Sequence, residues 1–260
     1  MITHVPDELV RFAGELADAS GVVIRRYFRT GLGIEIKPDQ SPVTIADKET
    51  ETAIRTLLRA RYPGHGVIGE EHGRDRPDAE FVWILDPIDG TKSFITGRPT
   101  FGTLIALAHQ GEPVLGVVDH PMLRERWIGA AGHPTTHDGR PVRSRPCAVL
   151  KQAAMFASSP HCFDEVGVGA AYERVRRVAR QVVYGSDCYA YGLIASGFGD
   201  LSIEAKMEIY DYLAAVPVIE GAGGILTDWQ GRRPTIRSGD RVVASGDRRI
   251  HEQVLEILAN

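Results

Sequence analysis

Residues 81–94, FVWILDPIDGTKSF, constrain the fold more than any other part of this chain. The first five are all apolar, which is typical of a buried strand. Asp86 stands at the end of this run, where Pro87 is expected to stop the sheet because it has no N–H to donate. Asp89 follows, and Gly90-Thr91 begin a predicted helical turn. Two carboxylates at such a corner, beside free backbone N–H groups, can hold a hard cation and a phosphate together.

Taken alone, this corner has a simpler interpretation, because Asp-Pro and Asp-Gly dipeptides are common in ordinary turns. The rest of the chain decides between the two. With 260 residues it has room for one large domain or two packed sub-domains. Its composition, 43% hydrophobic and 25% charged, is that of an ordinary globular protein.

Charge and cysteine usage exclude several classes of protein. The 30 basic and 34 acidic residues give a net charge of −4, and a nucleic-acid binder would show a basic stripe instead. Three cysteines without a close pair make neither a disulfide framework nor a zinc site, which indicates a reducing compartment. With no secretory leader and no apolar run of about 18 residues, we expect a cytoplasmic protein that does not bind membranes.

Hydrophobic periodicity predicts an α+β first half. Helices are expected at residues 7–28 and 44–61, and strands at 33–37, 67–69, 81–85, 101–108, 114–119 and 125–130. The last three are close in sequence and predict an antiparallel meander. Residues 38–42 and 72–80 are expected to be loops.

Strands and helices alternate in the second half, which predicts a layered α/β arrangement. The strands are expected at residues 151–158, 181–184, 201–204, 225–228 and 241–245, and the helices at 164–180, 189–196, 210–222 and 247–258. Residues 133–146 are rich in Pro, Gly and His. They predict a boundary between an N-terminal sub-domain, residues 1–140, and a C-terminal one, residues 141–260.

Three further acids stand at the ends or beginnings of predicted elements. Glu70 follows a short strand, Asp47 lies in the first turn of a helix, and Asp211 begins another helix. Each has a structural interpretation: a solvated turn for Glu70, a favourable helix dipole for Asp47 and an N-cap for Asp211. With Asp86 and Asp89, the acids Glu70 and Asp211 offer only oxygen ligands and no His or Cys cluster, which favours Mg²⁺ or a similar hard cation. Clustered carboxylates repel one another unless cations lie between them, so a site with two or three metal ions is physically consistent.

Three motifs, in this order and spacing, resemble the signatures of the inositol monophosphatase superfamily. They are Gly69-Glu70-Glu71, WILDPIDGT at residues 83–91, and YDYLA at 210–214 with EGAGG at 220–224. The resemblance covers nearly the whole chain. It implies an αβαβα sandwich of alternating helix and sheet layers, usually seen as a homodimer. It also implies Mg²⁺-dependent hydrolysis of a small-molecule phosphate monoester.

Site residues follow from this resemblance, position by position. It implies two or three Mg²⁺ ions per subunit, with the ligands Glu70, Asp86, the carbonyl of Ile88, Asp89 and Asp211. A metal-activated water, held near Glu70 and Thr91, would attack phosphorus in line, while a second metal stabilises the leaving alkoxide. Asp47 would support Thr91 and a further metal through water. The residues implied to bind substrate are Asp89, Gly90, Thr91, Gly185, Ser186, Asp187, Glu204 and Asp211.

Within the superfamily, LRERWIG at residues 123–129 and YGSDCYAY at 184–191 are similar to the histidinol-phosphate phosphatase branch. Inositol phosphatases typically have a small residue where this chain has Asp187. Asp187 and Glu204 would complement the ammonium and imidazole of L-histidinol phosphate, whereas an unpaired buried acid beside inositol costs free energy. The sequence therefore predicts histidinol-phosphatase activity in histidine biosynthesis.

Several alternatives stay open at this point. Asp187 is also placed to cap the helix that begins near Tyr189, and Glu204 to face solvent at a strand end. The nearest alternative function is an inositol-1-phosphate or broad sugar-phosphate monophosphatase, which needs the same metal ligands. A catalytically silent binding protein on the same scaffold is a different class, and the intact acids at the expected metal positions argue against it.

Overall fold

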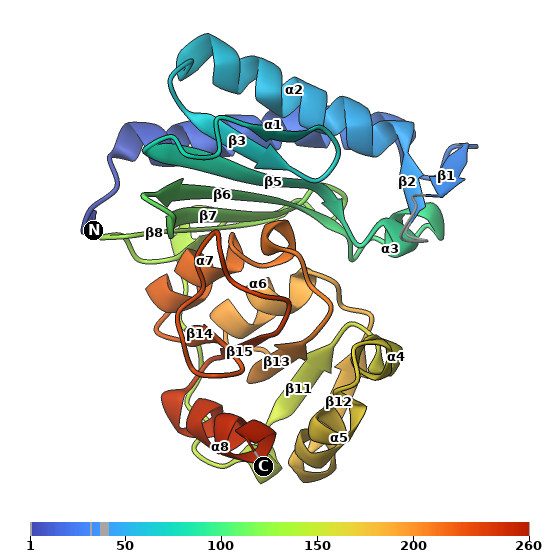
Figure 1. Cartoon of the computed structure of the whole chain (residues 1–260), viewed down its shortest axis with the longest axis vertical. Helices are drawn as coiled ribbons and strands as arrows, with labels where there is room; N and C mark the ends of the chain where they lie inside the picture. Colours follow the sequence, from blue (N-terminus) through green and yellow to red (C-terminus); the bar gives the residue numbers. More distant parts are fainter. Residues whose placement is uncertain (1, 32, 37–41, 260) are drawn as a thin grey trace.

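The computed structural model describes residues 2–31, 33–36 and 42–259, in which helices and sheets alternate in five layers (Figure 1). The layers are α1 (Asp7–Tyr27) with α2 (Ile45–Arg61), an eight-stranded sheet, α6 (Tyr189–Ala195) with α7 (Ala215–Gly221), a five-stranded sheet, and α4 (Pro160–Glu165), α5 (Gly169–Val178) and α8 (Arg248–Ala259). This arrangement confirms the predicted αβαβα sandwich.

The larger sheet has the strand order β10-β9-β8-β7-β6-β5-β3-β4. Its strands are β3 (Gly66–Gly69), β4 (Gly73–Asp75), β5 (Phe81–Asp89), β6 (Gly102–His109), β7 (Glu112–His120), β8 (Glu125–Ala130), β9 (Thr136–His137) and β10 (Arg140–Pro141). Strands β6, β7 and β8 form the predicted antiparallel meander. On the side of β5 that faces away from this meander, β5 pairs parallel to β3. Strands β1 (Ile34–Ile36) and β2 (Pro42–Thr44) pair antiparallel in a separate two-stranded sheet, and most of the loop predicted at 38–42 lies outside the described residues.

The smaller sheet has the order β12-β11-β13-β15-β14. Its strands are β11 (Ala154–Ala157), β12 (Gln181–Tyr184), β13 (Leu201–Glu204), β14 (Ile225–Asp228) and β15 (Val242–Ser245). Strand β11 pairs parallel to β12 and β13, whereas β15 pairs antiparallel to β13 and β14. The predicted boundary region 133–146 contains the β9–β10 hairpin of the larger sheet, and the division into two sub-domains stays a prediction.

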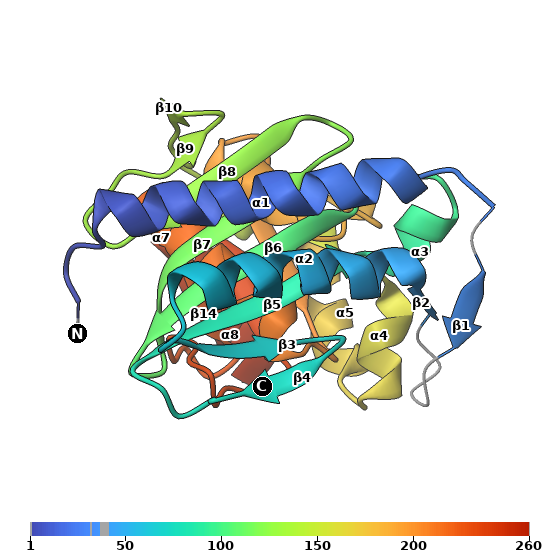
Figure 2. The same cartoon turned by 90° about the horizontal axis from the view of Figure 1, so that it is seen from above.

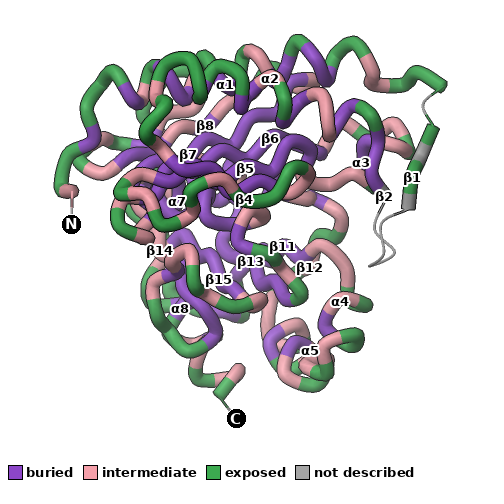
Figure 3. Tube along the Cα trace, turned by 45° about the horizontal axis from the view of Figure 1, so that its top comes forward, coloured by how far each residue is buried: buried purple, intermediate pink, exposed green. Residues whose placement is uncertain are grey.

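Helices α1 and α2 lie alongside each other across the outer face of the larger sheet (Figure 2). Both are amphipathic: Leu9, Phe12 and Leu16 of α1 are buried, and so are Ile54 and Leu58 of α2. Their outer faces are exposed, while the central strands of both sheets are buried (Figure 3). No helix within the described ranges has the length and apolar character needed to span a membrane.

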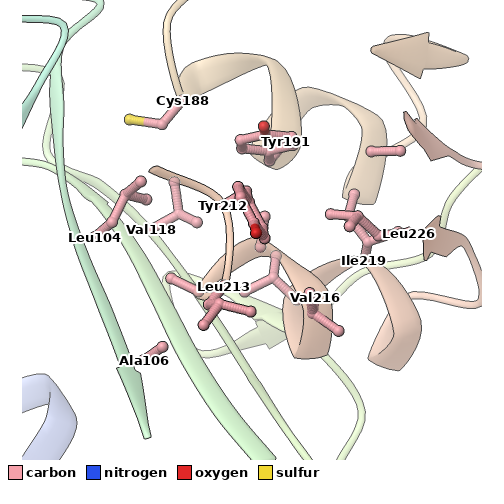
Figure 4. Packing of buried hydrophobic residues seen from close by; sticks show 14 of the residues in the cluster. Leu104, Ala106, Val118, Cys188, Tyr191, Tyr212, Leu213, Val216, Ile219 and Leu226 are labelled. Carbon is pink, nitrogen blue, oxygen red and sulfur yellow. The ribbon is translucent and has the colours of Figure 1, made fainter. Parts of the chain in front are cut away.

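The middle layer packs tightly between the two sheets. Figure 4 shows Leu104, Ala106 and Val118 of the larger sheet facing Leu213 and Val216, which come from α7 and the residues before it. Helix α7 approaches the backbone of β7 closely, since a Cβ built on Gly116 would lie 1.9 Å from the carbonyl oxygen of Ala214. Only glycine fits at this contact.

Strand β5 continues beyond the point where Pro87 was predicted to stop it. Asp86 pairs with Leu104, and the next pair is Asp89 with Gly102, so that the register shifts between them. Such an irregularity accommodates a proline because the local ladder hydrogen bond is already lost. The consequence is that both acids of the corner belong to one continuous strand.

Two predicted helices are divided in the structure, and one predicted loop contains a strand. The helix predicted at 164–180 breaks into α4 and α5 around Gly167, whose φ of 72° belongs to the left-handed region. The helix predicted at 210–222 is a 3₁₀ turn, η2 (Ile209–Asp211), followed by α7. The polar loop predicted at 72–80 contains β4, which pairs antiparallel to β3 at the sheet edge.

Candidate active site and metal centre

The corner after β5 is shaped by hydrogen bonds within the motif itself. The Ile88 N–H donates to Asp86 Oδ1 over 3.0 Å, and Thr91 Oγ1 donates to the Ile88 carbonyl over 3.1 Å. Gly90 has a φ of 83° and precedes α3 (Thr91–Ile95). A Cβ on Gly90 would lie 2.7 Å from Cγ of Asp187, so glycine is required by both conformation and space.

Three acids that the sequence predicted as metal ligands converge at this corner. Asp86, Asp89 and Asp211 each offer a carboxylate oxygen, and these oxygens all lie within 4.8 Å of one another. Asp86 and Asp89 come from β5, whereas Asp211 comes from the turn η2 of the second half. Glu70, directly after β3, lies close enough to Asp86 for the two carboxyl groups to interact. Residues more than 120 positions apart in the chain therefore build one site.

Asp211 does not cap α7, as one interpretation of its sequence position proposed. Its carboxylate accepts the backbone N–H of Glu208 over 2.7 Å, which fixes the turn η2. Helix α7 begins four residues later, after Ala214. The acid is thus held by its own turn and directed toward the carboxylates of β5.

The electrostatics of the cluster are unfavourable for a set of ionised acids. Burial raises the pKa of Asp86 well above its ordinary value, and the charges of Glu70, Asp89 and Asp211 raise it further. Burial and the charge of Asp187 raise the pKa of Asp89 to about 7. Burial, followed by the charge of Asp89, also raises the pKa of Asp211 well above the usual range. A set of this kind is ionised at neutral pH only when positive charge lies among its members.

The donor set fits hard divalent cations. The cluster offers only carboxylate and carbonyl oxygens, the ligands that Mg²⁺ prefers in proteins. Asp47 adds a second observation, because it is 1% exposed and its Oδ1 has no hydrogen-bond partner among the described residues. Burial raises the pKa of Asp47, and the charge of Glu70 contributes to the same direction. A buried oxygen without a partner beside other acids is the arrangement expected at a cation site.

The support that Asp47 was expected to give Thr91 is not seen as a direct contact. Asp47 Oδ2 instead accepts the N–H and hydroxyl of Thr44, over 2.8 and 2.6 Å, in the capping box that begins α2. The Thr91 hydroxyl is directed to the Ile88 carbonyl. The catalytic roles of Glu70, Thr91 and Asp47 stay predictions.

Asp187 lies at the edge of the cluster, held by two hydroxyl groups. Its Oδ2 accepts Ser93 Oγ over 2.6 Å and Thr100 Oγ1 over 2.7 Å. It does not cap α6, which begins without a side-chain cap, so that alternative was wrong. Its φ of 48° is left-handed, which is uncommon for a residue with a side chain. Sequence reasoning missed Thr100 and left Ser93 unassigned.

The loop that carries Gly185, Ser186 and Asp187 is anchored to the first half of the chain. Arg98 donates to the Gly185 carbonyl over 2.6 Å, and the Cys188 N–H donates to Asp89 Oδ2 over 2.7 Å. The predicted substrate-binding segment is therefore attached directly to a predicted metal ligand.

Glu204 does not face solvent, which overturns the simpler interpretation of its position. It ends β13, is 4% exposed, and accepts the Ser158 N–H at Oε1 over 2.9 Å. Burial raises the pKa of Glu204 to about 8. Its Oε2 and the hydroxyl of the buried Tyr191 have no hydrogen-bond partner in the part of the chain that the structure describes. A polar ligand could form hydrogen bonds with both of these groups.

A second group of potential ligands, His4, Asp7 and His133, lies near the N-terminus and fits a metal poorly. The two imidazole rings are stacked, with centroids 4.5 Å apart and an interplanar angle of 25°. Ring lone pairs lie in the plane of each ring, so nearly parallel rings do not converge on one ion. The acid cluster is therefore the stronger candidate for a metal site among the described residues.

Comparison with known proteins identifies the family of this chain. The inositol monophosphatase family matches residues 5–260. The chain is 51% identical to the bifunctional phosphatase IMPL2, chloroplastic, of Arabidopsis thaliana, over 96% of this chain and 76% of that protein. It is 35% identical to the histidinol-phosphatase of Mycobacterium tuberculosis, over 92% of this chain and 94% of that protein. A solved inositol monophosphatase from Zymomonas mobilis superposes with a TM-score of 0.89 at 42% identity, covering 98% of both chains. The chain belongs to the inositol monophosphatase family.

Proposed function

We propose that this protein is a Mg²⁺-dependent phosphatase that hydrolyses L-histidinol phosphate to L-histidinol and phosphate. The family is metal-dependent, typically with Mg²⁺. The observation that carries the choice of substrate is Asp187, a carboxylate fixed by two hydroxyls against Gly90 at the edge of the metal centre. The hydroxyl groups of Ser93 and Thr100 both donate to Oδ2 of Asp187. The buried Glu204 adds a second acid, and the pair suits a substrate that carries an ammonium group and an imidazole.

Each predicted site residue has a place in this proposal. Glu70, Asp86, Asp89, Asp211 and the Ile88 carbonyl would hold two or three ions. When bound, Mg²⁺ stabilises negative charge on the phosphate and lowers the pKa of water.

The other residues bind and orient. Gly90 and Thr91 begin α3, whose first N–H groups have no acceptor within the helix and are suited to phosphate oxygens. Asp187 and Glu204, with Gly185 and Ser186, would orient the cationic end of the ester. Asp47 would complete the metal environment through its unpartnered oxygen.

The second candidate function is an inositol-1-phosphate or broad sugar-phosphate monophosphatase. The similarity to a solved inositol monophosphatase at 42% identity favours it, and so does a relative named bifunctional. The two functions share the metal centre and differ in the pocket around Asp187 and Glu204. A homodimer in the cytoplasm completes the proposal, and it rests on the family resemblance and the cysteine usage. Sedimentation analysis that finds only a monomer would contradict the dimer.

Phosphate release from L-histidinol phosphate and from inositol 1-phosphate, with and without Mg²⁺, tests the function. We expect kcat/KM to favour histidinol phosphate by about 100-fold or more, which corresponds to about 2.7 kcal/mol of transition-state stabilisation. Comparable rates, or a preference for inositol phosphate, would contradict the substrate and leave the metal-dependent phosphatase intact. Release that does not depend on Mg²⁺ would contradict both.

Replacing Asp187 by asparagine isolates the charge of this residue. Asparagine keeps an acceptor for the Ser93 and Thr100 hydroxyls and tolerates the left-handed φ, so the loop is expected to keep its shape. We expect KM for histidinol phosphate to rise about tenfold, as charge-assisted hydrogen bonds are lost. KM for inositol 1-phosphate in the same preparation is the internal control and is expected to change little. A similar change for both substrates removes Asp187 from substrate selection.

A further inference from the structure

A buried ion pair lies below the loop that carries Glu70. Glu51 and Arg55 stand four residues apart on α2, and Arg55 Nε donates to Glu51 Oε1 over 2.6 Å. Their side chains are only 0% and 6% exposed. A carboxylate buried in this way costs free energy unless its oxygens are fully hydrogen-bonded. The hydrogen-bond partners of the Glu51 carboxylate therefore indicate which part of the structure it stabilises.

Both oxygens of Glu51 accept backbone N–H groups from the residues that follow Glu70. The Glu71 N–H donates to Oε2 over 2.7 Å, and the His72 N–H donates to Oε1 over 3.2 Å. Arg55 adds a third contact with this loop, because its Nη2 donates to the Gly73 carbonyl over 2.5 Å. Three consecutive residues after Glu70 are thus tied to one helix.

The residue before Glu70 lies against the same carboxylate. A Cβ on Gly69 would be 2.0 Å from Glu51 Oε1, so the strand end and the carboxylate are in direct contact. On the opposite side, the Glu70 N–H donates to the Leu85 carbonyl of β5 over 3.2 Å. The backbone of Glu70 is fixed between β5, which supplies Asp86, and the carboxylate of Glu51.

From these contacts we infer that Glu51, neutralised by Arg55, is a positioning residue that holds Glu70 against Asp86 and thereby sets the affinity of the metal centre. The inference rests on the proposed function in that Glu70 is taken as a metal ligand. Asp47 stands four residues before Glu51 on the same helix; its Oδ1 has no hydrogen-bond partner among the described residues, and the charge of Glu70 acts on this carboxyl group. Helix α2 therefore positions two acids at once, one through its own side chain and one through a loop.

Replacing Glu51 by glutamine tests this role. Glutamine keeps the size and one acceptor oxygen, but its NH₂ group must face an N–H of the loop or of Arg55, which is a donor against a donor. We expect the dissociation constant for Mn²⁺, measured by electron paramagnetic resonance without substrate, to rise about 10- to 100-fold, the range for residues that orient metal ligands. Amide hydrogen exchange at Glu71 and His72 is expected to accelerate in the metal-free protein, while kcat at saturating Mg²⁺ falls much less.

Asp200 offers a matched control in the other half of the chain. It is a buried carboxylate that accepts Arg145 Nε and Nη2, both over 2.6 Å, and the Ala154 N–H over 2.7 Å. Asp200→Asn is therefore expected to lower the melting temperature comparably, with the Mn²⁺ dissociation constant within about twofold of the wild type because distant sites act independently. An unchanged Mn²⁺ affinity in Glu51→Gln, or equal weakening in Asp200→Asn, overturns the inference.

A second variant covers the case in which Glu51→Gln does not fold. Glu51→Leu with Arg55→Met replaces the ion pair by apolar side chains, a change that buried pairs often tolerate. It still removes the acceptor for the Glu71 and His72 N–H groups, so the same loss of Mn²⁺ affinity is expected, and a wild-type affinity overturns the inference. A wild-type chain that binds no Mn²⁺ at all contradicts the proposed function instead.

Discussion

Asp89→Asn is expected to reduce phosphatase turnover by at least about a thousandfold at saturating Mg²⁺, or roughly 4 kcal/mol of transition-state stabilisation. Asp89 stands where three carboxylates converge, and its Oδ2 also accepts the Cys188 N–H beside the substrate loop. An amide keeps the shape but removes a negative charge from the cation site, so that both metal affinity and phosphate orientation suffer. Steady-state phosphate release over a Mg²⁺ titration measures the effect.

Asp78→Asn is the control for this change. Asp78 is exposed and lies outside the acid cluster, so the same chemical substitution is expected to leave turnover unchanged. The melting temperature provides a second readout. Since Asp89→Asn removes one of several repelling acids, the metal-free variant is expected to melt no lower than the wild type. Substantial turnover in Asp89→Asn at high Mg²⁺ would contradict the metal role.

Removing metal is expected to make the stability of the protein strongly dependent on pH. A carboxyl group whose pKa is higher in the folded than in the unfolded protein stabilises the fold while it is protonated, and this contribution is lost as pH rises through the folded pKa. For Asp89 and Glu204 those values are about 7 and about 8. Between pH 6.5 and 8.5, in a chelator, the melting temperature is therefore expected to fall by roughly 5 °C or more.

Saturating Mg²⁺ is expected to remove most of this pH dependence, because bound cations compensate the charge of the ionised carboxylates in place of protons. We expect saturating Mg²⁺ to raise the melting temperature clearly at pH 8.5 and much less at pH 6.5. Burial lowers the pKa of His120 and His251 to about 4, and these groups affect stability mainly below the pH range chosen. Thermal unfolding at both pH values, with and without Mg²⁺, checks the prediction, and a metal-free melting temperature independent of pH would refute it.

Much of the site was predictable because its main acids lie in short motifs. Asp86 and Asp89 share one strand, so their proximity follows from local sequence alone. Glu70 and Asp211 were candidates from their positions at element ends, but only the family resemblance assigned them to the same site, since nothing in the local pattern shows that η2 folds back onto β5. The capping box of Thr44 and Asp47 was readable as a helix start, but the buried, unpartnered oxygen of Asp47 was not.

What the sequence did not reveal depends on contacts between distant residues. Ser93 and Thr100 lie 94 and 87 positions before Asp187, and no local pattern links these hydroxyls to that acid. The helix predicted at 210–222 failed for a different reason. The apolar period continues through η2, but the backbone turns there so that Asp211 can accept the Glu208 N–H. The prediction that Pro87 ends the strand was also wrong, because a shift in strand register between Asp86 and Asp89 accommodates the proline.

The close contact between Gly116 of β7 and Ala214 links the position of Asp211 in the proposed metal site to a residue in the middle of a sheet. Ala214 follows Asp211 by three residues, and its carbonyl rests on the β7 backbone where a Cβ would be only 1.9 Å away. A methyl group at position 116 would overlap the Ala214 backbone, so we expect it to shift this segment and, with it, Asp211 relative to β5. Natural variation at this sheet position, which lies outside the acid cluster, is therefore expected to be restricted by the geometry that the proposed metal site requires.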